Sequence, residues 1–535
     1  MEKQKFHTRT QTINGVVYVY EDHPYWNSEK QQTRHKRVYI GKKNSDGVFV
    51  PNASYLKRLS AGAAPSSEGA LAPVQRRFAG VSHLLDQISS LAMISADLQA
   101  CFPKDHRAIL SLAYYLVSES EAPMYRFGHW ARSHTHPYDA ELTSQRISEV
   151  FSRISYDGVM RFLAKQRARY GDKEHLVYDI TSISSYSELL RQVRYGKNKS
   201  GEPLPQLNLA LVFGQTSMMP VYYRTLPGNV TDVTTLRKLL RDLQLMDIGK
   251  TRLVLDRGFY SARNVDSLYQ NRCKFVLGSR RNTRFAQAHI EENRQQLTDF
   301  SSYDAELGLH VATALDMWPY KEYDNEGRPI EQGRRRIYVH MYHNSAQAEA
   351  DKTSFFAQLS QTTQALTNGG CSPQQQAMAE EFLFVHTTPV RGMSITPNEE
   401  AIRAHTAEFG YFVLLSNEIK DPKQALWIYR NKDVVEKAFS NLKNRLNMRR
   451  PHVQSEESLE GKLFVQFVAL MLVSYIHKQM KKHALYKNWT LQEVLDELDA
   501  VEQFDQQGKR PHYGEVTGKQ RKLYEYLGIK PPGML

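Results

Sequence analysis

The sequence predicts an α/β fold built on a mixed sheet. Three strand-like segments come first, followed by a helix, a strand, a second helix and a last strand, at residues 174–184, 208–214, 220–228, 231–246, 251–256, from about 261, and 274–279. Strands separated by short turns pair antiparallel, whereas strands joined through a helix lie parallel. The series therefore predicts both kinds of pairing in one sheet, with at least one parallel crossover.

Length and charge indicate a multidomain protein that attracts polyanions. At 535 residues the chain is too long for a single core. Lys and Arg number 70 against 57 Asp and Glu, a net charge of +13, and such a balance favours partners such as nucleic acid. The three cysteines form no CxxC pair, which argues against a disulfide framework or a zinc site and fits a reducing cytoplasm.

Two segments bear on targeting. The polar start of the chain has no apolar region typical of a secretory signal. The most apolar run, Leu463 to Ile476, is shorter than the ~20 residues of a membrane-spanning helix and contains Gln466. We therefore expect a cytoplasmic protein with a buried core helix in this region.

Residues 1–59 form a predicted β element. Strand-like patches lie between residues 12 and 52, with a hairpin signal at 44–47. The cationic cluster from Arg34 to Arg37 is suited to DNA phosphates, and an exposed hairpin with solubilising charge is the alternative. The small and flexible residues of 60–76 predict a linker.

The remaining organisation is helical, then α/β, then helical again. Residues 77–170 predict a helical domain, a candidate for binding DNA ends, with helices at 81–91, 109–116 and 147–162. Its His129, His134 and His136 have no cysteine or acidic neighbour at a metal-ligand spacing and read as surface histidines of a loop. The predicted core occupies 171–280 and 424–480, a β-rich insertion occupies 281–423, and a helical tail at 481–535 is a candidate for dimerisation.

Three acidic residues stand out. Asp179 and Asp256 lie near the carboxyl ends of two predicted strands, where open α/β sheets bind ligands. A predicted helix over 429–443 brings Tyr429, Lys432, Glu436 and Lys443 onto one stripe. An apolar stripe lies beside it, formed by Val435, Ala438, Phe439, Leu442 and Leu446. Strand-end or capping aspartates and a Lys432–Glu436 surface pair are the structural alternatives.

The three carboxylates suggest metal chemistry on phosphates. Hard oxygen ligands are those preferred by Mg²⁺ or Mn²⁺, and a pair of such ions activates the attacking hydroxyl and stabilises the leaving oxygen of an in-line phosphoryl displacement. Arg257 and the lysines Lys432 and Lys443 would add positive charge near the scissile phosphate.

These residues sit in motifs that resemble a known family. YDITS, VLDRGF, Y-x2-K-x3-E-x6-K, RRP and EGKLFVQFVALML, in this order, resemble the DDE transposases of bacterial insertion sequences, in the branch marked by a Tyr-Arg-Glu-Lys signature. The resemblance implies an RNase H-like core interrupted by a β-rich insertion, two divalent ions, and cut-and-paste movement of the element's DNA. By the same match Asp179, Asp256 and Glu436 would bind the metals.

The match also implies how DNA is held. Tyr429, Lys432 and Lys443 would contact phosphates near the cleaved end, although Lys432 stands where the family signature has Arg and so lacks the bidentate fork. The implied partners are the terminal inverted repeats and target DNA, bound by a synaptic homodimer. An RNase H-like nuclease or recombinase, and a DNA-binding regulator without catalysis, remain as alternatives.

Overall fold

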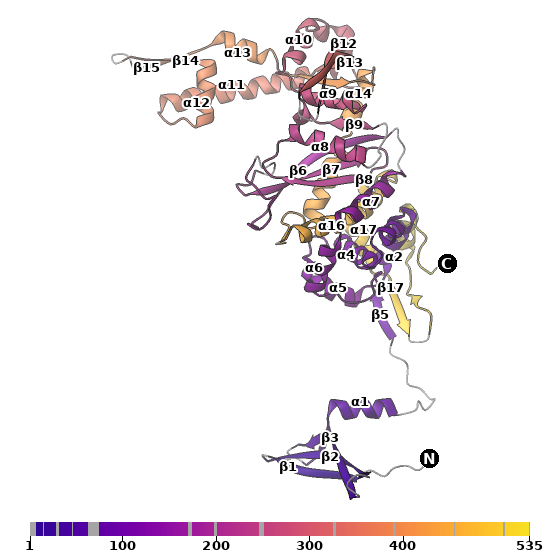
Figure 1. Ribbon diagram of the computed structural model, residues 1–535. Helices are drawn as coiled ribbons and strands as arrows, with labels where there is room; N and C mark the ends of the chain where they lie inside the picture. Colours follow the sequence, from indigo (N-terminus) through magenta and orange to yellow (C-terminus); the bar gives the residue numbers. More distant parts are fainter. Residues whose placement is uncertain are drawn as a thin grey trace. The chain divides into compact units, whose positions relative to one another are not determined.

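The chain forms two compact units, Met1–Val74 and Gln75–Leu535, drawn as ribbons in Figure 1. The computed structural model describes residues 7–13, 15–27, 32–44, 47–62, 74–169, 174–196, 199, 201–245, 251–324, 328–388, 392–453, 455–506 and 509–533. Each unit has its own sheet, and the two are described separately.

The N-terminal unit is an antiparallel sheet followed by a helix. Its strands pair in chain order, and its elements are β1 (His7–Ile13), β2 (Val16–Asn27), β3 (Gln32–Lys43), β4 (Phe49–Pro51) and α1 (Ala53–Gly62). Val19 and Ile40 are buried in its small core. Ser45 and Asp46 of the predicted hairpin, and residues 63–73 of the predicted linker, lie outside the described residues.

The larger unit is organised around a sheet of nine strands within the described chain. Its order is β11-β12-β13-β16-β10-β9-β6-β7-β8. The strand bounds are β6 (His175–Ser184), β7 (Gln206–Gly214), β8 (Pro220–Pro227), β9 (Arg252–Leu255), β10 (Lys274–Ser279), β11 (Tyr303–Asp304), β12 (Leu309–Tyr323), β13 (Pro329–His343) and β16 (Tyr411–Ser416). The β6–β9 and β9–β10 pairs are parallel and the others antiparallel, which confirms the predicted mixed sheet.

Helices connect these strands as the sequence predicts. After the β6–β7–β8 meander come α8 (Asp232–Leu245), β9, η2 (Arg257–Phe259), α9 (Ala262–Gln270) and β10. Further along, α10 (Arg284–Glu292), η3 (Gln296–Thr298) and η4 (Phe300–Ser302) precede β11. The segment predicted as a β-rich insertion thus contributes β11, β12, β13 and β16 to the same sheet.

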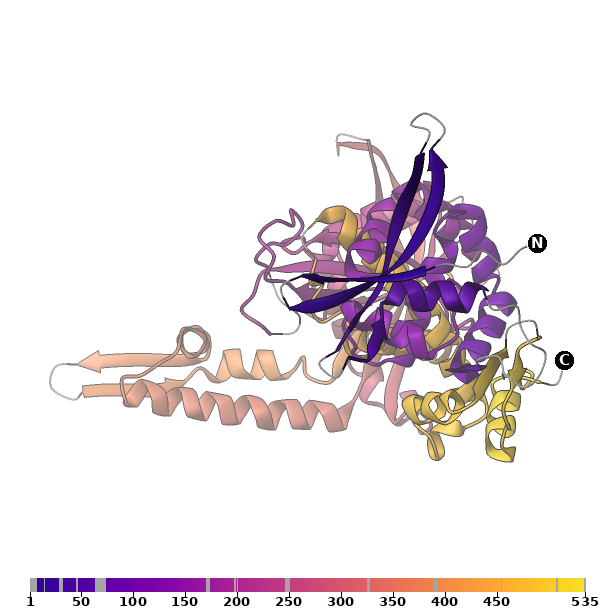
Figure 2. The ribbon, with the colours of Figure 1, turned by 90° about the horizontal axis from the view of Figure 1, so that it is seen from below.

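A helical arm lies between β13 and β16 in the chain. It comprises α11 (Ser345–Thr367), α12 (Pro373–Phe382), the hairpin β14 (Leu383–Thr388) and β15 (Gly392–Pro397), and α13 (Glu399–Thr406). A separate apolar cluster that includes Phe355, Phe382 and Phe409 holds it together. In Figure 2 the arm extends away from the sheet.

The region before the sheet is helical. Its elements are α2 (Gly80–Leu91), α3 (Ile94–Cys101), α4 (His106–Ser118), η1 (Met124–Arg126), α5 (Phe127–Ser133), α6 (Ser144–Arg153) and α7 (Tyr156–Arg167). The single helix predicted over 147–162 is wrong, because Ser155 ends the run and caps α7 by accepting from the Gly158 N–H.

The expectation of surface histidines is also wrong for two of the three. His134 and His136 are buried, and His129 is exposed. His134 Nε2 lies 3.1 Å from Asp499 Oδ2, and its ring stacks on Trp130. This acidic partner is remote in sequence, so no spacing rule could find it, and the contact is structural.

Helix α16 (Glu456–Lys482) is the central core helix. It is long and apolar enough to cross a membrane, but 89% of its most apolar window is buried inside the protein. The prediction of a core helix is therefore confirmed. Gly461 allows a close approach to α6, since a Cβ there would lie 2.2 Å from the Phe151 carbonyl oxygen.

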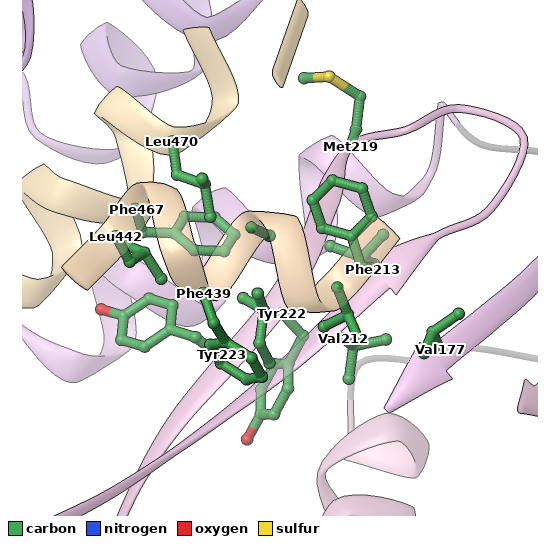
Figure 3. Packing of buried hydrophobic residues seen from close by; sticks show 14 of the residues in the cluster. Val177, Val212, Phe213, Met219, Tyr222, Tyr223, Phe439, Leu442, Phe467 and Leu470 are labelled. Carbon is green, nitrogen blue, oxygen red and sulfur yellow. The ribbon is translucent and has the colours of Figure 1, made fainter. Parts of the chain in front are cut away.

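The segments before and after α16 complete the unit. They are α14 (Pro422–Arg430), α15 (Asp433–Ser440), the π-helical turn η5 (Asn441–Arg445), η6 (Leu485–Lys487), α17 (Leu491–Asp499), β17 (Glu502–Gln506), β18 (His512–Tyr513) and α18 (Gly518–Tyr526). β17 pairs with both β18 and β5 (Val74–Phe78) in a small three-stranded sheet. Figure 3 shows Phe439 and Leu442 packed with side chains of β7, β8 and α16.

Candidate active site

Two of the predicted acids stand side by side within the sheet. Asp256 directly follows β9 as predicted, but Asp179 lies in the middle of β6 and not near its carboxyl end, because β6 continues along β7 to Ser184. The parallel strands β6 and β9 pair Tyr178 with Leu255. Asp179 and Asp256 each follow this pair by one residue, and neighbouring strands are ~4.8 Å apart. Asp256 precedes η2, but its side chain does not cap that turn. The capping alternative therefore does not explain this carboxylate.

The third acid comes from a helix that differs from the prediction. A continuous helix over 429–443 is wrong: α14 ends at Arg430, α15 begins at Asp433, and Lys443 lies in the π-helical turn η5. The Lys432 N–H donates to the Tyr429 carbonyl and closes a tight turn between the helices. The apolar stripe from Val435 to Leu446 is buried as predicted.

Asp256 is held by groups from this turn. The Tyr429 hydroxyl donates to Asp256 Oδ1 at 2.6 Å, and Lys432 Nζ lies 3.4 Å from the same oxygen. Burial raises the pKa of Asp256, but Tyr429, Lys432 and the Arg257 backbone N–H together more than offset it. The pKa of Asp256 therefore lies below its ordinary value, and the carboxylate is ionised at neutral pH.

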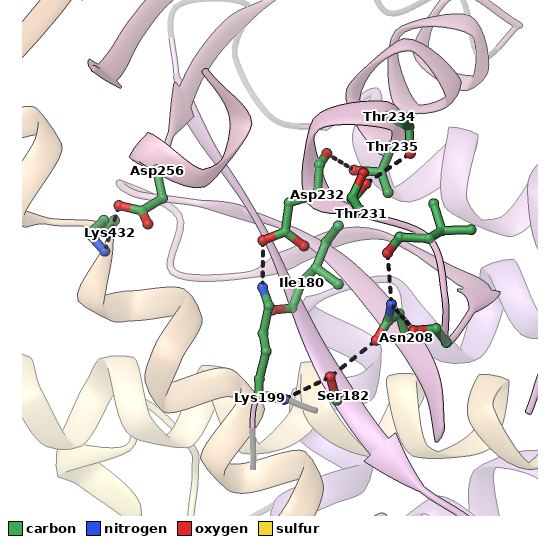
Figure 4. Close-up of polar contacts among 12 residues, drawn as sticks. Ile180, Ser182, Lys199, Asn208, Thr231, Asp232, Thr234, Thr235, Asp256 and Lys432 are labelled. Atoms are coloured by element: carbon green, nitrogen blue, oxygen red, sulfur yellow. Dashed lines mark hydrogen bonds and ion pairs between the residues drawn. The ribbon is translucent and has the colours of Figure 1, made fainter. Parts of the chain in front are cut away.

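Lys432 bridges two of the predicted acids. Its Nζ also lies 3.4 Å from Glu436 Oε1. Burial lowers the pKa of Lys432, but Asp256 and Glu436 together raise it by more than burial lowers it. The net shift of the pKa is upward. The ammonium thus occupies the place between the two carboxylates (its contact with Asp256 is drawn in Figure 4).

Gly278 allows Tyr429 to reach Asp256. A Cβ at Gly278 in β10 would lie 2.7 Å from the Tyr429 hydroxyl oxygen and 2.9 Å from the Arg257 nitrogen. A side chain at this position would therefore displace both groups. The sequence analysis did not single out Gly278, although an isolated glycine in a strand is a known sign of a close backbone approach.

Asp179 differs from Asp256 in its electrostatics. Burial raises the pKa of Asp179 to about 6, and the neighbouring charge of Asp256 raises it as well. Lys199 and Lys432 act in the opposite direction and only partly offset these effects. Asp179 is thus a carboxylate with too little positive charge around it.

Lys199 and Asp232 form a second group beside these acids that the sequence analysis missed. Lys199 Nζ lies 3.0 Å from Asp232 Oδ2 and donates to the Ile180 carbonyl at 2.7 Å (Figure 4). Asp232 begins α8 and approaches η2, since a Cβ at Gly258 would lie 3.2 Å from its Oδ2. A lysine in a polar turn carries no sequence signal for such a position.

Lys443 and Arg257, the other predicted cations, have different surroundings from Lys432. Burial lowers the pKa of Lys443; Glu202 raises it, and Lys199 and Arg449 lower it further. Lys443 therefore belongs to a mainly cationic group with Lys199 and Arg449. The Arg257 side chain is exposed, and the contribution of this residue to the acids comes through its backbone N–H.

The three acids suit a divalent metal by chemical type. Among the described residues, however, no three His, Cys, Asp or Glu side chains are gathered closely enough to hold a metal ion. Asp179 adjoins Asp256, and Lys432 links Asp256 to Glu436. The deficit of positive charge at Asp179 and the ammonium between the other two carboxylates both mark a place that favours a cation.

Comparisons with known proteins identify related sequences. Residues 170–472 match a family model described as a transposase DDE domain, which spans more than half of the chain. Asp179, Asp256 and Glu436 fall within this range of residues. Among solved structures, the chain is similar to the piggyBac transposase in a synaptic complex with hairpin DNA, at 11% identity over 83% of this chain and 74% of that chain. The TM-score is 0.33, which is too low to define a common fold. No curated protein matches the chain.

Proposed function

Because the chain belongs to the DDE transposase family, we propose that it moves an insertion sequence by cut-and-paste transposition. The proposed reaction is a divalent-metal-dependent cleavage of DNA strands at the element's ends, followed by strand transfer. In the transfer step the 3′ hydroxyl of a cleaved end attacks a phosphorus of the target DNA. A new P–O bond forms, and the target's own 3′ oxygen leaves.

The proposed catalytic core is RNase H-like. The strand order β8-β7-β6-β9-β10, with an antiparallel meander followed by two parallel additions, supports this assignment. Asp179 and Asp256 on the two central strands are the observation that carries the proposal, because the sheet register alone makes them neighbours. The bacterial origin and the Tyr-Arg-Glu-Lys branch rest on the motif resemblance.

Asp179, Asp256 and Glu436 would hold the metals, Mg²⁺ or Mn²⁺, in a two-ion arrangement. Such ions would activate the attacking oxygen and neutralise charge on the leaving oxygen. Glu436 is the acid best able to adjust, because its side chain is 57% exposed. Tyr429 fixes the carboxylate of Asp256, and Lys432 is placed to exchange its carboxylate partners for a DNA phosphate.

The DNA partners would be the terminal inverted repeats and the target duplex, in a synaptic homodimer. Lys443 and Arg257 are the further proposed phosphate contacts, and Lys199 joins them because it lies near Asp179. The buried free thiols of Cys101 and Cys273 suit the proposed cytoplasmic setting.

The test uses purified protein, Mg²⁺ and a DNA fragment that carries the flanking inverted repeats. Wild type should release cleaved ends and join them to a second duplex, and Asp256→Asn and Glu436→Gln should do neither. Both changes keep the size of the side chain, so both variants should fold like wild type. Circular dichroism checks this. Cleavage retained in either variant would refute the assigned triad, and cleavage by wild type without joined products would identify a nuclease.

A further inference from the structure

The N-terminal unit contains a two-stranded ribbon that extends beyond its sheet. The β1 pairing ends at Asp22 of β2, and β4 pairs only with residues 41–43 of β3. Within the described chain, residues 23–27 of β2 therefore pair only with residues 32–36 of β3. Figure 2 shows these two long strands projecting from the rest of the unit.

The ribbon has a positive surface with exposed aromatic rings. Its segments HPYWN and QTRHKR contain no acidic residue. Arg34, Lys36 and Arg37 are exposed, and so are Tyr25 and Trp26, at 48% and 62%. The ribbon therefore combines cations with large apolar surfaces that no described segment covers.

Two acids, Glu21 and Asp22, lie at the base of the ribbon, and Glu21 Oε2 lies 3.3 Å from His23 Nε2. Asp22 is 3% exposed, and its Oδ2 lies 2.8 Å from Arg9 Nε and 3.0 Å from His35 Nδ1. Two basic groups thus pair with this carboxylate inside the unit. Farther along the ribbon, Arg34 and Lys36 are exposed.

Protection of a sheet edge explains only part of this composition. Lysines and arginines on exposed strands prevent edge-to-edge association. Exposed Tyr and Trp side chains instead promote association, because they add apolar surface. They lie on a two-stranded ribbon, which is only marginally stable on its own. Aromatic rings interleaved with cations suit duplex DNA, whose major groove offers thymine methyl groups for apolar contact between the two rows of phosphates.

We propose that this ribbon, residues 23–27 with 32–37, binds in the major groove of duplex DNA. The major groove is about 12 Å wide and accepts a two-stranded ribbon. The register places Tyr25 opposite Arg34 and His23 opposite Lys36, so these four side chains share one face. The inference rests on the proposed function only in taking DNA as the partner. It assigns DNA affinity to the N-terminal unit and says nothing about the catalytic step.

The test compares two double variants of the full chain in EDTA, so that no cleavage is needed. Arg34→Ala/Lys36→Ala removes one arginine and one lysine from the ribbon. Arg521→Ala/Lys522→Ala removes the same pair of residue types from exposed positions on α18 and is the matched control. Fluorescence anisotropy measures the affinity for a labelled duplex between about 50 and 200 mM salt.

The ribbon variant should lose about 1.8 from the slope of log K against log salt, because each phosphate contact contributes about 0.9. Its affinity at about 0.1 M salt should fall roughly 10- to 100-fold, while the control keeps the wild-type slope. Tyr25→Ala, which removes the aromatic ring of this face, should weaken binding without changing the slope. Dimethyl sulfate footprints should show protection of guanine N7, a major-groove atom, by wild type and not by the ribbon variant.

A wild-type slope in the ribbon variant, or an equal loss in the control, would overturn the proposal. Guanine N7 protection that survives in the ribbon variant would also overturn it, since the groove would then be filled by another part of the chain. Failure of the proposed function is separate: in EDTA the slope of wild type would exceed that of the ribbon variant by about 1.8, yet wild type would neither cut nor join DNA in Mg²⁺.

Discussion

Replacing Lys432 with methionine should strengthen divalent-metal binding and weaken DNA cleavage at the same time. The Lys432 ammonium lies 3.4 Å from Asp256 Oδ1 and 3.4 Å from Glu436 Oε1. A metal that binds these oxygens must displace the ammonium or tolerate its charge. Methionine retains most of the side-chain length and removes only the competing charge.

The magnitude follows from the two ion pairs. The Asp256 and Glu436 side chains are 36% and 57% exposed, so water screens both contacts strongly. Exposed pairs of this kind contribute roughly 0.5 kcal/mol each, or about 1 kcal/mol together. Relief of this competition corresponds to about fivefold tighter metal binding. Loss of one cation at the scissile phosphate should lower the cleavage rate by about 100-fold.

Isothermal titration of Mn²⁺ into the DNA-free protein measures the first effect, and cleavage of a DNA end under saturating metal measures the second. Lys437→Met is the matched control, because Lys437 is an exposed lysine of the same helix α15. Unchanged or weaker Mn²⁺ binding by Lys432→Met would refute the competition, and wild-type cleavage would refute the phosphate contact.

Three further outcomes are expected. Gly278→Ala should impair cleavage and lower the melting temperature, because its Cβ would lie 2.7 Å from the Tyr429 hydroxyl; unaltered kinetics would contradict this role. Gly461→Ala should destabilise the protein by about 1–3 kcal/mol through contact with the Phe151 carbonyl while the cleavage rate of the folded fraction stays unchanged, as measured by thermal melts with activity assays. Burial lowers the pKa of His340 from the ordinary 6.5 to about 4. As the pH drops, the unfolded chain therefore binds a proton at this histidine before the folded protein does. The free energy of unfolding should fall between pH 6.5 and 4, by at most about 3 kcal/mol. NMR of labelled histidines should show His340 neutral at pH 5, and a midpoint near 6.5 would contradict its burial.

The sequence predicted the parts of the site that depend on local pattern. The meander, the parallel additions and Asp256 at the end of β9 follow from apolar runs separated by turns and a helix, and the structure confirms the mixed sheet. The strand end predicted near Asp179 is wrong, since β6 continues to Ser184. The buried stripe through Val435 and Phe439 was likewise readable from helical spacing. Periodicity reports burial well because it reflects one face of one element.

Features that depend on remote contacts were not predictable. The helix break at Asn431 and Lys432 has no proline or glycine to signal it. Before the break Tyr429 donates to Asp256, and after it α15 packs against β6 and β7. The π-helical turn that carries Lys443 has no composition signal either. Strand β16 lies beside β10, and β13 and β12 follow it in the same sheet. The pattern of apolar residues within each segment does not predict which strands become neighbours.

The different supports of the three acids determine how the site tolerates sequence change. The spacing of Asp179 and Asp256 is set by a ladder of backbone hydrogen bonds, which survives most exchanges of apolar side chains beneath it. Glu436 instead rests on a short helix seated by Val435 and Phe439, so repacking of that contact shifts its carboxylate. In laboratory evolution of a variant with impaired cleavage, we therefore expect second-site mutations that restore activity to cluster under α15. Such mutations should be rare beneath the two aspartates.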